Sequence, residues 1–325
     1  MSSSSALDSR AKPWLSPAGQ VAHLKGKGVR FELISEQEAE AYLTRNNNYF
    51  RLRSFGTGFP KVEGGSRAGK YVNLDFKMLV DLSIVDMLLR YEMLPMALDI
   101  EHFTKVGLLG RIAGMGEDGY AVVADFLASY DRVHADGSVG NRLKSEIEKG
   151  CSSSYVAGLL ERYPNHGYPV WAFLEVLTFG TFLQFYRFCA DRFANREMRN
   201  AYYLLQAVKG LRNACAHNNC ILNDLASGTA KHNVQPAVSQ ALARIVGIGA
   251  GTRKSKMSNE RVQQITTTLY VHQASVSDGV RMSRSKSLHE FVGRMNRHAG
   301  YYRGNLQVSS AFGFLSKVID AWYPL

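Results

Sequence analysis

Apolar residues recur at helical spacing along most of the chain, and no alternation typical of β-strands persists. The clearest run lies between about residues 71 and 107, where the recurring positions are Leu79, Leu82, Val85, Leu88 and Leu89. Residues 170–193 are apolar on nearly all sides, which is typical of one central buried helix. We therefore predict an all-α protein, built as a helical bundle with additional N- and C-terminal helices.

Polar and glycine-rich stretches indicate where helices begin and end. Ser16 followed by Pro17 predicts one helix start, and Ser35 with Glu38 has the spacing of a capping box. The glycine-rich residues 107–120 predict a mobile connection, since they contain neither the GK[ST] nor the GxGxxG frame of a phosphate loop. A polar linker follows Asp224, and further helices are expected near residues 235–247, 258–272, 286–297 and at the C-terminus.

The composition is that of an ordinary globular protein, with 46% hydrophobic and 21% charged residues in a chain of 325. The first residues lack the apolar core of a secretory signal. The longest apolar run is interrupted by Asp86, Arg90, Glu92 and Pro95, which argues against a membrane span. The four cysteines form no CxxC pair, as suits a reducing compartment. We expect a soluble cytoplasmic protein without a membrane partner.

Positive charge is concentrated near the C-terminus. The formal net charge is +11, and residues 251–325 contribute +7 of it, with 11 Lys and Arg against 4 Asp and Glu. Such a segment attracts polyanions by releasing their counterions, although a merely soluble basic surface would have the same composition. The candidate RNA-binding residues are Arg253, Lys254, Lys256, Arg281, Arg284, Lys286, Arg294, Arg297 and Arg303.

A dense polar cluster, LRNACAHNNC, occupies residues 211–220 directly after an apolar run. On a helical wheel Asn213 and His217 lie four positions apart on one face, and the long side chain of Arg212 can reach that face. The apolar residues of the opposite face are Leu204, Val208, Leu211 and Cys215. The helix would therefore bury one side and present asparagine and histidine on the other.

Phosphate chemistry suits these residue types better than a metal site does. His217 has no second close pair of metal ligands beside it, and we expect neither a metal nor a cofactor. A guanidinium holds phosphate oxygens in a fork, and an imidazole moves protons near neutral pH. The Arg-x4-His spacing alone carries little information, because Arg284 and His289 repeat it, but an asparagine directly after the arginine is more specific. A histidine that simply caps the helix is the alternative.

The hexapeptide RNACAH resembles the RNxxxH signature of HEPN ribonucleases, and the chain resembles their Abi-like branch, the AbiD/AbiF abortive-infection proteins of bacteria. The similarity extends to further blocks, which together span residues 12–224. These blocks are KPWLSPAGQVAHLKGKGV, NNNYFRLRSF, SIVDMLLRYEMLPMALDIEHFTK, WAFLEVLTFGTF and LRNACAHNNCILND. The C-terminal third matches only loosely, through its final helix.

The resemblance implies a HEPN bundle that cleaves RNA without metal at a composite site in a homodimer. In that case Arg212 would stabilise phosphate charge, Asn213 would orient the substrate or the histidine, and His217 would act as acid and base. Glu175 and Thr178 match the family's polar pair on one face of the neighbouring helix, where Glu175 is expected to be a buried carboxylate that orients the arginine. The family's basic residue after the histidine is missing, because Cys220 and Ile221 stand there.

The same resemblance suggests the organisation of the chain and its partners. We expect a disordered segment at residues 1–11, an Abi-like HEPN domain at 12–224, and a basic helical extension at 225–325 packed on that domain. Some relatives are associated with a small noncoding RNA, which the basic segment would bind. Two alternatives remain: a HEPN protein that binds RNA without cleaving it, and a helical module that binds another protein.

Overall fold

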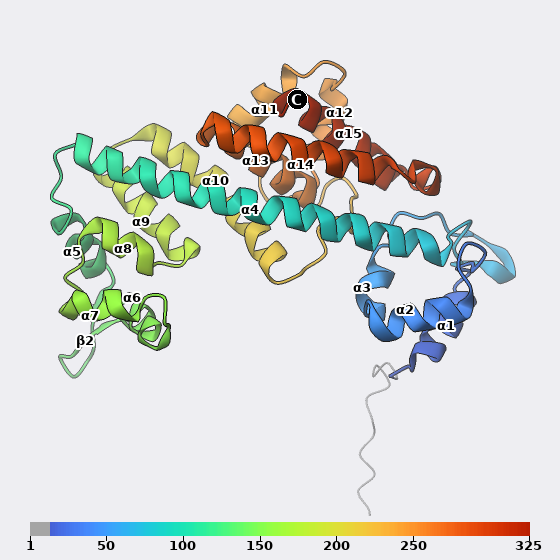
Figure 1. Ribbon diagram of the computed structural model, residues 1–325, viewed down its shortest axis with the longest axis horizontal. Coiled ribbons are helices and arrows are strands. Elements are labelled where there is room, and N and C mark those ends of the chain that lie inside the picture. The colour runs from blue at the N-terminus through green and yellow to red at the C-terminus, as the bar shows by residue number, and fades with distance from the viewer. Residues whose placement is uncertain (1–13) are drawn as a thin grey trace, which may run out of the picture. The chain divides into compact units, whose positions relative to one another are not determined.

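The computed structural model describes residues 14–325, so the predicted disordered segment 1–11 lies outside the described residues. Across that described range, 15 α-helices, four short 3₁₀ helices and one small hairpin form the regular structure, which confirms the all-α prediction (Figure 1). The helices are α1 (Pro17–Gly26), α2 (Glu36–Arg45), α3 (Tyr49–Ser54), α4 (Phe76–Gly114), α5 (Ala121–Ala128), α6 (Arg142–Glu148), α7 (Ala157–Arg162), α8 (Val170–Val176), α9 (Phe179–Arg192), α10 (Arg196–Ala216), α11 (Pro236–Ala243), α12 (Ala250–Met257), α13 (Glu260–Ser275), α14 (Asp278–Asn296) and α15 (Leu306–Trp322). The antiparallel hairpin consists of β1 (Asp131–Val133) and β2 (Val139–Asn141).

The chain divides into two compact units, each assembled from separate segments. The first unit comprises the described residues up to Leu88 together with Leu222–Ala226 and Val292–Gly313. The second unit comprises Leu89–Ile221, Ser227–Phe291 and Phe314–Leu325. Residues after 224 therefore contribute to both units. Within residues 14–325, no helix is both long and apolar enough to cross a membrane.

The first unit begins with the two helix starts that the sequence predicts. The Ser16 hydroxyl accepts a hydrogen bond from the Gly19 N–H at 3.2 Å, with Pro17 as the first residue of α1. At the start of α2, Ser35 and Glu38 form a complete capping box, each side chain accepting from the other residue's backbone N–H. Both caps satisfy backbone donors that have no partner inside a helix.

A buried carboxylate organises the C-terminal part of the first unit. Asp81 on α4 is 3% exposed and accepts hydrogen bonds from Arg294 Nη2 at 2.6 Å, His298 Nδ1 at 2.9 Å and the Tyr302 hydroxyl. Burial alone would raise the pKa of Asp81, but the three donors together lower it below its ordinary value. The carboxylate therefore stays ionised inside the unit, where it ties α4 to residues more than 200 positions away.

In the second unit, the glycine-rich stretch belongs largely to α4 and not to a mobile connection, so that prediction is wrong. The helix continues to Gly114 and includes Gly107 and Gly110. Leu108 and Ile112, which alternate with these glycines, are buried in the core of the second unit. Their packing outweighs the roughly 1 kcal/mol that each interior glycine costs a helix.

The predicted single helix over residues 170–193 is also incorrect, because the structure has two helices there. α8 ends at Val176, and both Leu177 and Thr178 have extended backbones. The Thr178 hydroxyl accepts from the Thr181 N–H at 3.2 Å and so caps a new helix, α9. A threonine in this position offers the backbone a local alternative to the helical hydrogen bond, which explains the break.

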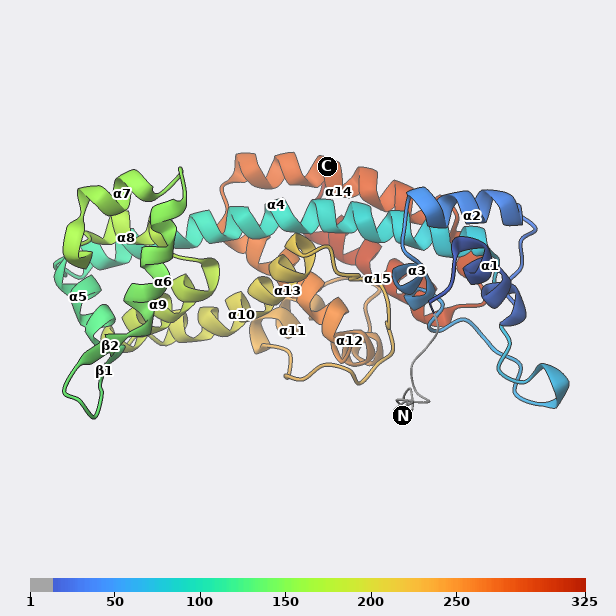
Figure 2. The same cartoon turned by 90° about the horizontal axis from the view of Figure 1, so that it is seen from below.

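The centre of the second unit is formed where α10 packs against α9 and α13. Aromatic residues of α8 and α9, including Phe173, Phe182 and Phe185, are fully buried in its core together with Val208 of α10. The β1–β2 hairpin leads directly into α6 beside α9 (Figure 2). This packing leaves one side of α10 uncovered.

Candidate functional site

The motif lies at the C-terminal end of α10, and a specific residue ends that helix. Asn218 has a φ of +61°, the left-handed conformation that asparagine tolerates better than most residues. The Asn219 N–H then turns back to the Ala214 carbonyl at 2.8 Å, while the His217 N–H still bonds to the Asn213 carbonyl at 2.9 Å. His217 is therefore held as the C-cap residue, directly after the last residue of α10.

The two faces of α10 match the helical wheel. Val208, Leu211 and Cys215 are buried, whereas Asn213 and His217 are exposed. The Arg212 side chain lies between these faces and is half-buried. Its Nη1 donates a hydrogen bond to Asn213 Oδ1 at 3.3 Å. The structure therefore brings the arginine to the asparagine and leaves the imidazole accessible.

The guanidinium of Arg212 retains unused donors. Its buried Nε has no hydrogen-bond partner among the described residues, and no carboxylate there pairs with the side chain. A buried donor without a partner is costly, and a charged one especially so. An anion placed beside this guanidinium would remove that cost.

Cys215, which lies within the motif, is a packing residue in this structure. Cys215 is buried, and burial raises its pKa to about 12, so the thiol is neutral and unreactive at neutral pH. Among residues 14–325, no group of three or more His, Cys, Asp or Glu side chains could hold a metal ion.

The polar pair on the neighbouring helix is not arranged as predicted. Glu175 is exposed near the end of α8, and in the described chain its side chain makes no hydrogen bond or ion pair. Thr178 caps α9, so the break at Leu177 separates the two residues onto different helices. The expectation of a buried Glu175 that orients Arg212 is therefore wrong, because among residues 14–325 the side chain that bonds to Arg212 is Asn213.

A cavity that the sequence pattern does not single out lies near the start of α9 and the middle of α10. This α9–α10 cavity has a volume of about 720 Å³. Its lining includes three cationic side chains, Arg132 of β1, Arg142 of α6 and Lys209 of α10, and one carboxylate, Glu146. Lys209 lies four positions before Asn213, so extending the exposed stripe of α10 by one turn would have found it.

The family comparison agrees with the position of the motif. A model of the family described as "Abi-like protein" matches residues 42–223. The chain belongs to the Abi-like family. The match includes α8, α9 and α10 with Arg212, Asn213 and His217, and it ends before the basic C-terminal segment. No curated protein and no solved structure is significantly similar to the chain.

In this Abi-like chain, several of the predicted RNA-binding residues already have partners within the fold. Arg281 pairs with Asp278 at 2.8 Å, Arg284 with Asp99 at 2.9 Å, and Arg294 with Asp81 at 2.6 Å. Arg253 donates to the Ile248 carbonyl at 2.8 Å. Arg284 and its neighbours lie in α14. These partners leave Arg284 and Arg294 in particular with structural roles.

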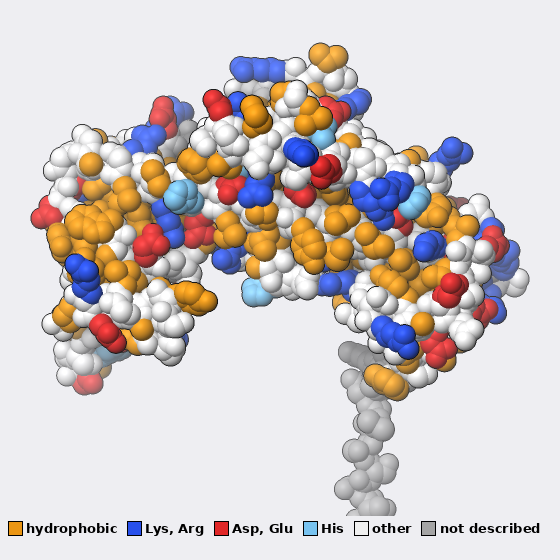
Figure 3. Space-filling view, in the orientation of Figure 1, with side chains coloured by type: hydrophobic (Ala, Val, Ile, Leu, Met, Phe, Trp, Pro, Cys, Tyr) orange, Lys and Arg blue, Asp and Glu red, His pale blue; other side chains and the backbone are white. Residues whose placement is uncertain are grey.

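Four other predicted RNA contacts are exposed. Lys254 and Lys286 belong to the second unit, and Arg297 and Arg303 to the first. Lys256 is half-buried, and burial lowers its pKa. On the face shown in Figure 3, basic and acidic side chains of the described chain are interspersed. The basic surplus of the C-terminal segment is thus distributed and partly neutralised.

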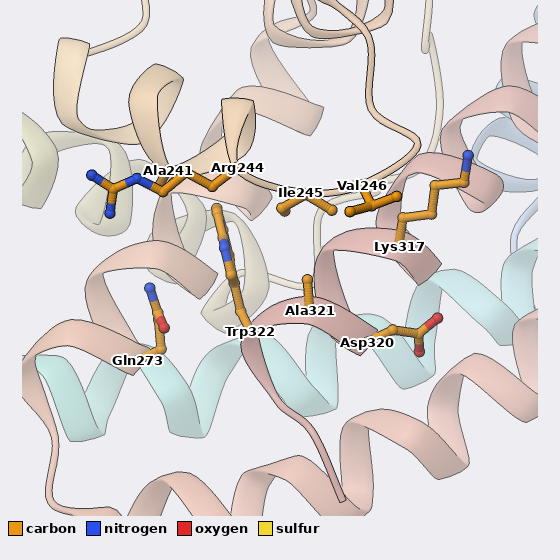
Figure 4. Close-up of a pocket in the computed structure, with 9 residues that line it drawn as sticks. All are labelled: Ala241, Arg244, Ile245, Val246, Gln273, Lys317, Asp320, Ala321 and Trp322. Atoms are coloured by element: carbon orange, nitrogen blue, oxygen red, sulfur yellow. The ribbon is translucent and has the colours of Figure 1, made fainter.

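A second hollow, of about 620 Å³, lies among residues of α11, α13 and α15 (Figure 4). It combines Arg244, Asp320 and the indole of Trp322, so its charges have both signs. Its other cation, Lys317, donates to the Gly247 carbonyl at 2.8 Å. Its surplus of positive charge is smaller than that of the α9–α10 cavity, with two cations against one carboxylate, and we assign it no ligand.

Proposed function

We propose that this Abi-like protein is a metal-independent endoribonuclease of the HEPN superfamily that limits phage by abortive infection. Family membership supports the connection to abortive infection. The observation that carries the nuclease proposal is the exposed end of α10, where Asn213 and His217 share one face and Arg212 bonds to Asn213. These are the residue types that RNA cleavage needs when no metal takes part.

The reaction is an internal transfer at a ribose phosphate. His217 removes the proton of the 2′-hydroxyl, and the 2′-oxygen forms a new bond to the adjacent phosphorus. Arg212 stabilises the negative charge that develops on the phosphate oxygens. The bond from phosphorus to the 5′-oxygen then breaks, and that oxygen takes up a proton. The products carry a 2′,3′-cyclic phosphate and a 5′-hydroxyl.

A homodimer would supply the second proton-transfer group. The mechanism needs one base and one acid, whereas each chain offers a single histidine at the motif. Two copies meeting through the uncovered side of α10 would place both His217 imidazoles beside one substrate. The exposure of Asn213 and His217 is what such a composite site requires.

The exposed basic residues support a separate contact with RNA. Lys254 and Lys286 of the second unit, and independently Arg297 and Arg303 of the first, would contact a small noncoding RNA that restrains the nuclease in uninfected cells. Binding of structured RNA should then weaken with added salt and on neutralising Lys286, Arg297 and Arg303. Binding that responds to neither change would contradict this contact.

The test of the nuclease compares the purified wild type with His217→Ala in EDTA, after sequencing any RNA that co-purifies. The wild type should release fragments with 2′,3′-cyclic phosphate ends, and His217→Ala should not. His102→Ala, which alters an exposed histidine on α4, is the control and should cleave normally. Cleavage by His217→Ala at the wild-type rate would contradict the proposal.

The other outcomes identify the alternatives. In the first alternative, the wild type binds RNA, His217→Ala binds it more weakly, and no fragments with cyclic-phosphate ends appear. That result would indicate a protein that binds RNA without cleaving it. Absence of RNA from the purified protein, with normal phage defence by Arg212→Ala, would indicate a helical module that acts on another protein.

A further inference from the structure

The α9–α10 cavity is lined by more positive charge than its own carboxylate neutralises. Arg132, Arg142 and Lys209 make no ion pair or side-chain hydrogen bond with any residue in the described range 14–325. Glu146 accepts a hydrogen bond from the Thr181 hydroxyl at 3.3 Å. Three cations against one carboxylate, without internal partners, form a lining that attracts an anion.

Further polar groups line the same cavity. Its lining also includes Thr178, Thr181, Tyr130 and Gln184. Hydroxyl and amide groups donate hydrogen bonds to phosphate and sugar oxygens without reading base sequence. Guanidinium and ammonium groups bind phosphate by charge and, for arginine, in a fork. The combination is suited to a phosphate-bearing ligand.

Lys209 connects this cavity with the motif. Lys209, Asn213 and His217 follow one another at intervals of four residues, so they form one stripe along α10. With a rise of 1.5 Å per residue, the stripe extends about 12 Å from Lys209 to His217. Stacked bases lie about 3.4 Å apart, so this length corresponds to roughly three to four stacked nucleotides.

We propose that the α9–α10 cavity binds backbone phosphates of the RNA strand that is cleaved at His217. Arg142 and Lys209 hold the strand at one end of the stripe, and Arg212 holds the reacting phosphate at the other. Sequence preference does not arise in the cavity, because its contacts are to the backbone. The inference rests on the proposed nuclease function and assigns the binding site that this function needs.

The test measures binding of a fluorescent single-stranded RNA to full-length protein in the His217→Ala background, where the probe stays intact. Arg142→Gln/Lys209→Gln is compared with Lys144→Gln/Lys149→Gln. The control pair also removes two positive charges, at Lys144 within α6 and at Lys149 directly after it. Neither residue lines the cavity. Thermal melting verifies that both variants are folded.

The cavity variant should bind the RNA at least tenfold more weakly than the control pair. Its salt dependence should also fall, by ~0.7 in the slope of log K against log salt for each lost phosphate contact. Equal affinity and equal slope in the two variants would overturn the inference. The inference would also be wrong if binding of a mononucleotide requires Arg142 and Lys209 while binding of RNA does not. The ligand of the cavity would then be a free nucleotide.

Failure of this inference differs from failure of the proposed function. If the cavity variant binds RNA as the control does, while wild-type protein still cleaves RNA and His217→Ala does not, the nuclease stands and the cavity has no part in it. If the wild type neither binds nor cleaves RNA, both proposals are wrong.

Discussion

The Arg212 guanidinium donates a hydrogen bond from Nη1 to Oδ1 of Asn213, its neighbour in sequence, at 3.3 Å. Consecutive side chains on a helix diverge by about 100°, so the contact requires the long arginine side chain to turn toward the exposed face. Asn213 thereby holds the cation on the side of α10 that carries His217. The asparagine directly after the arginine is thus explained by geometry.

This relationship predicts the effect of Arg212→Lys. An ammonium group cannot bond to Asn213 and also grip a phosphate in a fork, so RNA cleavage should fall on the order of 100-fold. RNA affinity should change less, because the positive charge remains. Single-turnover cleavage in EDTA measures the effect, with Arg196→Lys, an exposed site in the first turn of α10, as the control. If Arg212→Lys cleaves RNA at the wild-type rate, a point charge at this position is sufficient for cleavage.

The end of α10 predicts a stability effect at Asn218. At its φ of +61°, the backbone conformation is roughly 1 kcal/mol less favourable for alanine than for glycine. Asn218→Ala should therefore lower the free energy of unfolding by about that amount. Asn218→Gly should leave stability within ~0.5 kcal/mol of the wild type. Urea denaturation measures both variants. If alanine and glycine prove equivalent, the left-handed turn does not hold the helix end.

The sequence was sufficient to predict the parts of the fold that depend on local patterns. The caps at Ser16 and Ser35 involve residues three positions apart, and the two faces of α10 follow from helical periodicity alone. The break at Leu177 was missed because hydrophobicity over residues 170–193 is continuous. The cap that Thr178 provides competes with that pattern, and the pattern alone cannot show which prevails.

Pairings over long distances in sequence could not be predicted. In the sequence, Arg284 and Arg294 count toward the basic C-terminal segment just as the exposed Arg297 does. Their carboxylate partners, Asp99 and Asp81, lie 185 and 213 residues away. Charge counting over a segment ignores such partners. The α9–α10 cavity was missed for the same reason, since the hairpin, α6, α9 and α10 meet there only in the folded chain.

The buried Asp81 predicts a large loss of stability with Asp81→Asn. The change leaves Arg294 without its ion pair in a buried site, so the free energy of unfolding should fall by about 3 kcal/mol at pH 7. The control is Asp278→Asn, which removes an exposed partner of Arg281 and should cost less than about 0.5 kcal/mol. Denaturant unfolding of the two variants gives the comparison.

The same residue predicts a direction for the pH dependence. The pKa of Asp81 is lowered in the folded protein, so its stabilising contribution is complete above the ordinary carboxyl pKa of about 3.9 and is lost as pH falls through the lower folded value. The difference in stability between wild type and Asp81→Asn should therefore be constant from pH 7 to pH 5 and shrink below about pH 4. A difference that shrinks between pH 7 and pH 5 would assign the effect to another group.

The composite site predicts the outcome of mixing the wild type with His217→Ala. If one site uses the His217 imidazoles of both copies, a dimer of one wild-type copy and one His217→Ala copy lacks one of the two proton-transfer groups and should not cleave RNA. Random exchange in an equal mixture leaves wild-type dimers as about one quarter of the molecules, so the mixture should cleave RNA at about one quarter of the rate of the same total amount of wild type. His102→Ala mixed with the wild type in the same way is the control and should keep the full rate. Size-exclusion chromatography with light scattering should show a dimer throughout. If exchange is complete and the mixture cleaves at half the rate, each copy works with its own His217, since every wild-type copy then stays active in whichever dimer it occupies.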